Sequence, residues 1–375
     1  MNATPSAEVG ARPTWAEVDL RVLRENLERI RAAVAPAKVM PMVKANAYGH
    51  GLDAVARFIE PIADYFGVGI VAEGARLRKL GIQKPILVAG GTLVEELPAL
   101  FQYDLTATVS SVSFLQAADA LAEATGRRLK VHLKIDTGME RLGVHEYEAE
   151  PFLEAALVCR HLEVEGIYTH FANGEVTGGK LTELQLERFA SVLDFYVKRD
   201  LPHPPLRHAC NSGGILHYPR AYFDLVRPGL LFYGIYPDQA SQRSIEVQPA
   251  LTWRSRVVHS KITQPGRPVS YGSTWAPRQA TRVITIPCGY ADGYSRRMSN
   301  LAEVMVNGQR QRQVGRICMD QFMVDVGDDP VEVGDTVTLL GEGITAEELA
   351  AWSGTIPYET LTGISERVPR VYRTE

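Results

Sequence analysis

Lys44 lies where a short apolar run, Val39 to Val43, opens into a polar loop that contains glycine. Such a run is typical of a buried parallel strand, and in an α/β barrel the groups that follow strand C-terminal ends face the active site. An amine at the rim of a dry pocket loses hydration, which lowers its pKa and frees its lone pair to attack an aldehyde. Lys44 is therefore a candidate Schiff-base lysine, and a solvated lysine at a strand end is the alternative.

Two glycine-containing turns later in the chain could hold a phosphate group. They are Cys210-Asn211-Ser212-Gly213-Gly214 and Arg227-Pro228-Gly229-Leu230. Glycine lets backbone N–H groups approach an anion, a serine hydroxyl adds a donor, and loops after strands seven and eight commonly bind phosphate in barrels. Pro228 has no N–H, so Gly229 and Leu230 would be the donors there. Ordinary tight turns are the alternative, but a lysine and a phosphate site together predict pyridoxal 5'-phosphate.

These residues need a scaffold that brings strand ends to one rim. From Lys38 to about Val226 the chain alternates short apolar runs with longer amphipathic stretches, which is typical of βα repetition. The predicted strands are Val39–Val43, Tyr65–Val68, Ile86–Val88, Leu105–Val109, Leu129–Ile135, Val164–Thr169, Leu206–Ala209 and Phe223–Val226, with helices such as Ala72–Leu80, Val112–Ala124, Pro151–Arg160 and Leu181–Arg199. Eight such units predict a closed (β/α)8 barrel.

The pattern changes after Tyr236-Pro237-Asp238, where alternating stretches are separated by glycine and proline. These stretches, Val257–Ile262, Val283–Ile286, Val304–Val306 and Thr336–Leu340, predict antiparallel strands. We therefore predict an α/β chain with a cofactor-binding TIM-like barrel over residues 14–240 and a mostly antiparallel β domain over residues 241–375. The alternation in residues 14–19 suggests a first strand that joins the second domain.

The composition excludes several classes of protein. The chain has 375 residues and a net charge of −4, so it lacks the basic excess that binds nucleic acid or an anionic membrane. The four cysteines are scattered without a CxxC pair, which argues against disulfides and a zinc site, and we expect no metal. Met1 to Pro13 have no signal-peptide pattern, and no span is long enough to cross a bilayer, so we expect a cytoplasmic protein.

A series of short motifs runs in order along nearly the whole chain. They include Val43-Lys44-Ala45-Asn46-Ala47-Tyr48-Gly49-His50-Gly51, Leu133-Lys134-Ile135-Asp136-Thr137-Gly138-Met139-Glu140-Arg141-Leu142-Gly143, Thr169-His170-Phe171, Asn211-Ser212, Val226-Arg227-Pro228-Gly229, Ser270-Tyr271-Gly272, Gly289-Tyr290-Ala291-Asp292-Gly293, Gly315-Arg316-Ile317-Cys318-Met319-Asp320-Gln321 and Ile356-Pro357-Tyr358-Glu359. Together they closely resemble the alanine racemase family. The resemblance implies a pyridoxal-phosphate-dependent racemase that interconverts L- and D-alanine, supplies D-alanine for bacterial peptidoglycan, and acts as a homodimer with shared active sites.

The resemblance also implies a two-base mechanism. Lys44 would hold the cofactor and act as one acid/base, and Tyr271 of the partner subunit would act as the other. A phenol is a poor base at neutral pH because its ordinary pKa is about 10. In the family this tyrosine is coupled to a histidine and an arginine, which by motif position are His170 and Arg227. Without the resemblance, Tyr271 would be read as a strand tyrosine in the core.

Arg227 separates the possible reactions on this cofactor. A guanidinium group only donates hydrogen bonds, so a pyridine nitrogen that faces it stays unprotonated and the cofactor is a weaker electron sink. A weak sink favours immediate reprotonation over transamination, whereas we expect a decarboxylase on a similar barrel to place a carboxylate there. An arginine paired with a surface carboxylate is the alternative, but its place beside the phosphate turn argues against it.

Further roles follow from the resemblance alone. The phosphate would be held by Tyr48, Ser212, Gly229, Leu230 and Tyr358, and Asn211 and His170 would also bind the cofactor. Arg141 would orient the substrate carboxylate and the Tyr271 phenol, with Lys134 carbamylated so that it becomes an anion beside that arginine. Met319 would offer a main-chain N–H near the substrate carboxylate, and Met319 and Asp320 would reach across from the partner subunit. Tyr290, with Tyr271 and Tyr358, would line a narrow corridor that selects a small substrate.

Three other hypotheses for the function stay open. The first is a racemase with a different or broader amino-acid range, and the second is a non-catalytic protein that binds pyridoxal phosphate. The third is a decarboxylase, which Arg227 disfavours. The remaining histidines are not grouped at metal-ligand spacing, so we expect surface or core roles for His132, His145, His161, His203, His208, His217 and His259.

Overall fold

The computed structural model describes residues 12–238 and 240–374. The chain divides into two compact units. One consists of residues 23–47 and 52–248, and the other of residues 48–51 and 249 onward together with the N-terminal segment up to residue 22. In the part of the chain that the structure describes, no helix has the length and apolar character needed to cross a bilayer.

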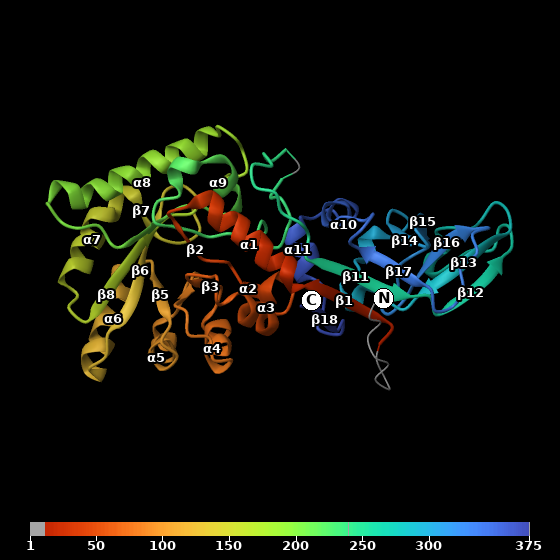
Figure 1. The fold of residues 1–375 in the computed structure, drawn as a ribbon, viewed down its shortest axis with the longest axis horizontal. Coiled ribbons are helices and arrows are strands. Elements are labelled where there is room, and N and C mark those ends of the chain that lie inside the picture. Colours follow the sequence, from red (N-terminus) through yellow and green to blue (C-terminus); the bar gives the residue numbers. More distant parts are fainter. Residues whose placement is uncertain (1–11, 239, 375) are drawn as a thin grey trace. The chain divides into compact units, whose positions relative to one another are not determined.

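The first unit is a curled parallel sheet surrounded by helices (Figure 1). Its strands are β2 (Lys38–Val39), β3 (Phe66–Val68), β4 (Ile86–Val88), β5 (Thr106–Val109), β6 (Leu129–Asp136), β7 (Val144–His145), β8 (Leu162–Tyr168), β9 (Leu206–His208) and β10 (Leu225–Val226). They pair in the order β3-β4-β5-β6-β8-β9, with β7 on β6 and β10 beside β2. A bridge between Met42 and Gly67 continues the pairing from β2 to β3, and a hydrogen bond from the N–H of Asp224 to Arg207 continues it from β9 to β10.

The strands form where the apolar runs are, because both faces of a parallel sheet are covered. All residues of β3 and β4 are buried, for example. The first strand is shorter than the predicted Val39–Val43, because Pro41 and Pro228 have no N–H and interrupt the ladder. The N–H groups of Met40 and Met42 still donate to the carbonyls of Val226 and Pro228.

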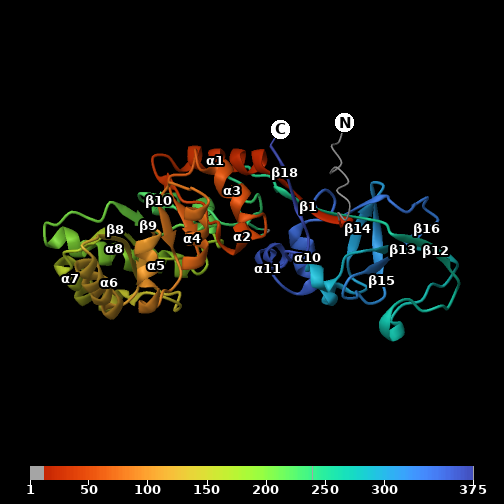
Figure 2. The same ribbon diagram turned by 90° about the horizontal axis from the view of Figure 1, so that it is seen from below.

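The helices of this unit lie outside the strands (Figures 1 and 2). They are α1 (Leu20–Val34), α3 (Leu52–Ile59), α4 (Val71–Lys79), α5 (Leu97–Gln102), α6 (Val112–Thr125), α7 (Ala149–Val158), α8 (Lys180–Lys198) and α9 (Ser212–His217). Capping residues set several of the ends. Ser111 accepts a hydrogen bond from the N–H of Phe114 at the start of α6, and Gly126 ends α6 with a left-handed φ of 62°.

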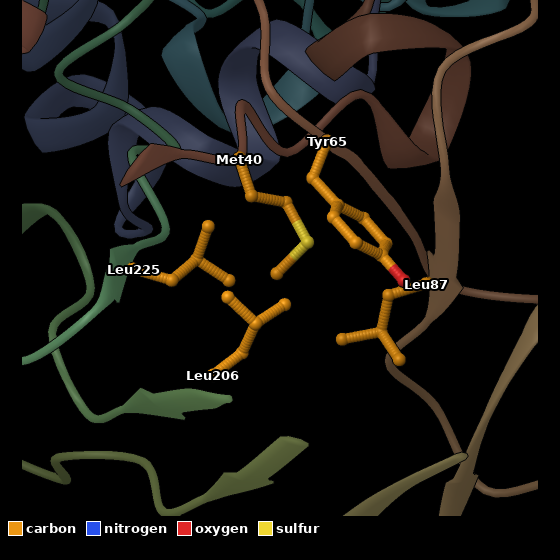
Figure 3. Packing of buried hydrophobic residues seen from close by; sticks show 5 residues of the cluster. All are labelled: Met40, Tyr65, Leu87, Leu206 and Leu225. Carbon is orange, nitrogen blue, oxygen red and sulfur yellow. The ribbon is translucent and has the colours of Figure 1, made fainter. Parts of the chain in front are cut away.

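Figure 3 shows the buried side chains that close the inside of the sheet. Met40, Tyr65, Leu87, Leu206 and Leu225 come from different parts of the sheet and are each less than 5% exposed. Their packing holds the strands at fixed positions, so the loops at the strand ends start from a rigid base.

The second unit is a nine-stranded sheet in the order β12-β13-β16-β15-β14-β17-β11-β1-β18. Its strands are β1 (Thr14–Asp19), β11 (Leu251–Arg256), β12 (His259–Thr263), β13 (Thr281–Ile286), β14 (Glu303–Val306), β15 (Gln309–Val314), β16 (Phe322–Gly327), β17 (Thr336–Leu340) and β18 (Arg370–Arg373), with helices α10 (Ala346–Ser353) and α11 (Pro357–Thr362). All its strand pairs are antiparallel except β1 with β18. Alternating burial in β11 and β16 is the pattern of a sheet with one covered face. The predicted fold class, a barrel and an antiparallel β domain, is confirmed.

Candidate functional site

Lys44 begins a turn with an unusual backbone. In α2 (Lys44–Tyr48) the φ angles of Ala45, Asn46, Ala47 and Tyr48 are 51°, 54°, 53° and 50°. These are left-handed helical values, which cost L-amino acids roughly 1–2 kcal/mol each. A run of such residues persists only where the surrounding structure fixes it, and strain of this kind gathers at functional sites. The sequence analysis did not predict this turn.

Glu73 fixes the turn, and it was not among the site residues predicted from the sequence. Its Oε1 accepts the N–H of Ala45 at 2.6 Å and its Oε2 accepts the N–H of Gly69 at 2.8 Å. The Oδ1 of Asn46 accepts the N–H of Leu52 at 2.9 Å, which anchors the other side of the turn. Glu73 joins the lysine loop to the loop after β3. No sequence signal separated Glu73 from other glutamates, because it lies inside the predicted helix Ala72–Leu80.

Positive charges gather around Lys44. Lys44 is exposed, but protein atoms around its amine partly desolvate it; this desolvation and the charge of Arg141 lower the pKa of Lys44, and the charge of Glu73 opposes them. Burial lowers the pKa of His170 well below its ordinary value, and the charges of Arg227, Lys134, Arg141 and Lys44 add to this effect. The structure therefore brings together five of the predicted site residues in an electropositive region that suits an anionic ligand.

Arg227 is fixed by four hydrogen bonds. Its NH1 donates to Nδ1 of His208 at 2.7 Å, and its NH2 donates to Nδ1 of His170 at 3.1 Å and to the carbonyls of Thr169 and Ala209 at 2.9 and 2.8 Å. The side chain is buried, and burial lowers its pKa to about 10. No hydrogen bond among the described residues uses Nε, so this donor can face an acceptor on a ligand.

Lys134 is a buried amine near these arginines. Its Nζ lies 4.9 Å from the centre of the Tyr168 ring and donates to the carbonyl of Ile135 at 3.2 Å. Burial lowers its pKa to about 7, and the charges of Arg227 and Arg141 contribute. At neutral pH a large part of this amine is therefore uncharged and nucleophilic.

The turn before Arg141 is built on Asp136. Its carboxylate accepts the N–H groups of Gly138, Met139 and Arg141 at 2.8, 2.9 and 3.1 Å. Burial alone would raise the pKa of Asp136, but these backbone donors lower it. Asp136 thus fixes the backbone from which the Arg141 side chain extends.

The two predicted phosphate turns meet at Ser212. Its Oγ accepts the N–H of Gly229 at 3.0 Å and that of Leu231 at 3.2 Å. The N–H of Gly229 is therefore already used, which leaves the hydroxyl proton of Ser212 as a donor. The N–H of Leu230 forms no hydrogen bond within residues 12–238 and 240–374. Asn211 caps α9, because its Oδ1 accepts the N–H of Gly214 at 3.0 Å.

The second unit contains Tyr48, four residues after Lys44, beside Tyr358 from α11. Their ring centres are 5.9 Å apart. The backbone between Tyr48 and Gly51 packs closely, since a Cβ on Gly49 would lie 2.2 Å from the carbonyl oxygen of Leu361. Glycine is required there, and φ of Gly49 is 81°. Tyr48 and Tyr358, two of the predicted phosphate ligands, thus lie next to one another.

Tyr271 is 72% exposed and lies in a short 3₁₀ turn, η4 (Tyr271–Ser273), rather than in a strand. It lines a cleft of about 560 Å³ together with Lys261, Arg267, Ser270, Cys318 and Met323. The Oγ of Ser270 donates to the carbonyl of Arg316 at 2.6 Å, which fixes the start of the turn. The phenol is therefore presented to solvent from an anchored backbone.

Met319 and Tyr290 are held next to one another. The N–H of Tyr290 donates to the carbonyl of Cys318 at 3.0 Å, and the N–H of Ala291 donates to the carbonyl of Met319 at 3.0 Å. Both side chains are exposed. Nearby, Asp320 accepts a hydrogen bond from Arg367 at 2.7 Å.

The residues of the first unit fit pyridoxal phosphate. An amine with a lowered pKa suits the aldehyde, the unused Nε of Arg227 suits a pyridine nitrogen, and the hydroxyl of Ser212 with the N–H of Leu230 suits a phosphate. The region around Lys44 is electropositive. Within the described chain no group of His, Cys, Asp and Glu side chains is arranged to hold a metal ion.

Comparison with known proteins gives a consistent result over the whole chain. Residues 18–237 match the family model "Alanine racemase, N-terminal domain" and residues 250–372 match "Alanine racemase, C-terminal domain". A protein of Carboxydothermus hydrogenoformans named alanine racemase is 44% identical over 96% of this chain and 100% of its own length.

Solved structures of alanine racemases are also similar to this chain. An alanine racemase of Clostridium difficile 630 superposes with a TM-score of 0.92 at 36% identity, covering 97% of this chain and 96% of that one. An alanine racemase of Bartonella henselae with covalently bound pyridoxal phosphate superposes with a TM-score of 0.90 at 29% identity, covering 97% and 100%.

Replacing Glu73 tests whether this carboxylate holds the lysine turn. In Glu73→Ala the N–H groups of Ala45 and Gly69 lose their acceptor, so their hydrogen exchange should accelerate about tenfold, the effect of one charge-assisted hydrogen bond. Exchange is measured by mass spectrometry on peptides that cover residues 44–52 and 66–72. The control is Glu123→Ala, an exposed position on α6. Unchanged exchange in the first variant would show that the turn does not depend on Glu73.

Proposed function

The chain belongs to the alanine racemase family, and on this premise we propose that it is a pyridoxal-phosphate-dependent isomerase that interconverts L- and D-alanine. The observation that carries the proposal is the arrangement around Lys44. A lysine with a lowered pKa lies in the same electropositive region as an arginine whose Nε makes no hydrogen bond within the described chain. In a bacterial cell D-alanine supplies peptidoglycan, and we assign the protein to the cytoplasm.

Lys44 would hold the cofactor and move a proton on one side of the substrate α-carbon. The cofactor, when bound, supplies an electron sink that acidifies the α-hydrogen of an amino acid. A lowered pKa increases the share of the Lys44 amine that is unprotonated, which is the form that accepts a proton. The left-handed turn and Glu73 support this role because they restrict where the amine points.

Tyr271 of the partner subunit would serve as the second base, on the opposite side of the α-carbon. Its exposure and its position on a cleft support a role at a surface that a second copy covers. We therefore propose a homodimer in which Tyr271, Met319 and Asp320 complete the site of the other subunit. Racemisation needs two bases on opposite sides, because each must remove the proton of one enantiomer and return a proton to form the other.

Arg227 would set the outcome of the reaction. Its Nε can only donate, so a pyridine nitrogen that faces it must accept and remain unprotonated. Burial lowers the pKa of Arg227 to about 10, so the group stays charged at neutral pH. An unprotonated pyridine nitrogen would favour the return of a proton to the α-carbon over decarboxylation or transamination.

The substrate would be held by its carboxylate. Arg141 offers a planar pair of donors, and the backbone of Met319 offers an N–H. Tyr290, Tyr358 and Tyr271 would narrow the access path and favour a small side chain. Each excluded methylene contributes only about 1–3 kcal/mol, so discrimination against larger amino acids need not be complete.

Lys134 would be carbamylated. The neutral amine attacks carbon dioxide to form an N–C bond and releases one proton, which converts an uncharged amine beside Arg141 and Arg227 into an anion. The pKa of about 7 for Lys134 supports this modification, because the reactive form is abundant at neutral pH. The resulting carboxylate would pair with Arg141 and orient it.

The direct test is a chiral assay of D-alanine formed from L-alanine, with and without added pyridoxal phosphate. We expect turnover that depends on the cofactor, and the cofactor absorbance of the pure protein should be lost in Lys44→Ala. Equal turnover of serine and alanine would instead support a racemase of broader range. Cofactor absorbance without any exchange of the α-hydrogen would support a non-catalytic binding protein.

A second prediction concerns Tyr271. In D₂O the parent protein should exchange the α-hydrogen of both enantiomers of alanine, and Tyr271→Phe should slow exchange from one enantiomer by at least about 100-fold, the contribution of one acid/base group. Proton NMR follows both reactions. Tyr147→Phe, an equally exposed tyrosine of the first unit, is the matched control. Equal loss for both enantiomers would contradict the assignment of Tyr271 to one side.

The third prediction concerns Lys134 and pH. Because its pKa in the folded protein is lowered to about 7, the reactive neutral form is scarce at pH 6 and predominant at pH 8. With ¹³C-labelled bicarbonate, a carbamate signal in ¹³C NMR should therefore grow as the pH rises through 7 and be absent from Lys134→Ala. No carbamate signal at pH 8, or a signal that persists in Lys134→Ala, would exclude the modification at this position.

A further inference from the structure

A line of polar side chains runs through the inside of the sheet behind Arg227. NH1 of Arg227 lies 2.7 Å from Nδ1 of His208, and Nε2 of His208 lies 2.8 Å from Nδ1 of His132. Nε2 of His132 lies 3.5 Å from Oε2 of Glu165. Both histidines are completely buried, and Glu165 is partly exposed at a surface pocket. The line thus joins the proposed cofactor site to a carboxylate at the opposite end.

The direction of every hydrogen bond in this line follows from Arg227. A guanidinium only donates, so Nδ1 of His208 must accept and the proton of His208 must be on Nε2. That N–H donates to Nδ1 of His132, which places the proton of His132 on its own Nε2. No hydrogen bond within the described residues uses this N–H, which lies 3.5 Å from Oε2 of Glu165.

The charge states agree with this direction. Burial lowers the pKa of His132 and lowers that of His208 well below its ordinary value, so both rings are neutral with one proton each. Burial alone would raise the pKa of Glu165, but the neighbouring His132 and the hydrogen bond from Tyr65 lower it to about 2. Glu165 is therefore a carboxylate at any physiological pH.

Arg227 has no carboxylate partner of its own. None of the ion pairs within residues 12–238 and 240–374 includes it, although it is buried beside the amine of Lys134. A buried charge without a partner is costly, and a chain of aligned hydrogen bonds in a region of low dielectric can transmit stabilisation from a distant charge. Glu165 is the anion at the end of such a chain.

The neighbouring residues shape this line. His132 pairs with Gly166 across β6 and β8, where the register shifts by a bulge between Val131 and His132. A Cβ on Gly166 would lie 2.6 Å from Nδ1 of His132, so only glycine leaves room for the ring. The ring of Tyr168 stacks on His208 with 4.5 Å between ring centres and an angle of 4°.

We propose that Glu165 and His132 are positioning residues that act through His208, and that Glu165 is the remote counter-charge that stabilises the buried cation of Arg227 and fixes its orientation toward the cofactor. The proposal rests on the proposed function, because it extends the same cofactor site. Other groups also face Glu165. Tyr65 donates to its Oε2 at 2.5 Å, and Nζ of Lys130 lies 3.5 Å from its Oε1.

The main test is Glu165→Gln in the intact holoenzyme. An amide oxygen can still accept from Tyr65 and still face the N–H of His132, so the variant removes the charge and keeps an acceptor in place. We expect pyridoxal phosphate to dissociate about fivefold faster and kcat for alanine to fall about fivefold, with KM within twofold of the parent. Glu163→Gln is the matched control, since Glu163 is an exposed glutamate on the same strand, two residues earlier.

A second measurement does not depend on turnover. In ¹⁵N-histidine-labelled protein, solid-state NMR reports which ring nitrogen carries the proton, and the signals are assigned by their loss in His132→Gln and His208→Gln. We expect the proton on Nε2 in both rings of the parent. In Glu165→Gln the Nε2 signal of His132 should move toward a weaker hydrogen bond. Tyr65→Phe should move it the opposite way, because the carboxylate loses a competing donor.

The outcomes separate the two proposals. A proton on Nδ1 of either histidine, or equal cofactor dissociation and kcat in Glu165→Gln and Glu163→Gln, would overturn the assignment of Glu165. If Glu165→Gln does not fold, Tyr65→Phe still decides through the direction of the His132 shift, and no shift would overturn the assignment. A protein with the expected histidine protons but no alanine turnover would refute the proposed function and leave the hydrogen-bond line intact.

Discussion

The site depends on the burial of Arg227 without an adjacent carboxylate. A guanidinium that paired directly with an acid would have its donors used and its charge cancelled. Here two neutral histidines and two backbone carbonyls accept from NH1 and NH2, and Nε has no acceptor in the described chain. The positive charge thus remains available to a ligand. Burial lowers the pKa values of His170, His208 and Lys134, and the charge of Arg227 lowers each of them further.

The same crowding of cations explains why the chemistry is divided among different residue types. Lysine amines can lose their proton and become nucleophiles when cations surround them, whereas arginine cannot. Lys44 and Lys134 therefore gain reactivity in the field that Arg227 and Arg141 create. The arginines keep their charge and serve as fixed donors. An exchange of lysine and arginine at any of these positions would remove a property that the other cannot supply.

Much of the fold followed from the sequence because its signals are local. Apolar runs marked the parallel strands, and β4 and β17 lie where they were predicted. Strand β15 was not predicted, since Gln309 to Gln313 are polar and their pairing depends on β14 and β16. The helix α1 was not named either. Its start depends on Asp19, which accepts the N–H of Arg21 and of Val22.

The site was predictable only where a residue type already implies chemistry. Lysines, arginines and a serine beside glycine could be predicted as site residues from the sequence. The structure brings Lys44, Lys134, His170 and Arg227 together. Supporting residues could not be separated from ordinary ones. Glu73 reads as a surface glutamate of an amphipathic helix, and His132 and His208 read as ordinary core or surface histidines. The sequence held one signal for His132: it is two residues before Lys134 in the same strand, so both side chains lie on the same face of the sheet.

The left-handed turn after Lys44 has a consequence for how the protein matures. Four successive residues hold a conformation that the free chain rarely visits, and contacts from residues later in the sequence stabilise it. During synthesis the turn therefore cannot form until Leu52 and Glu73 have been made and folded. The amine acquires its orientation only after the surrounding barrel exists, so a nascent chain presents an ordinary flexible lysine to any aldehyde that it meets.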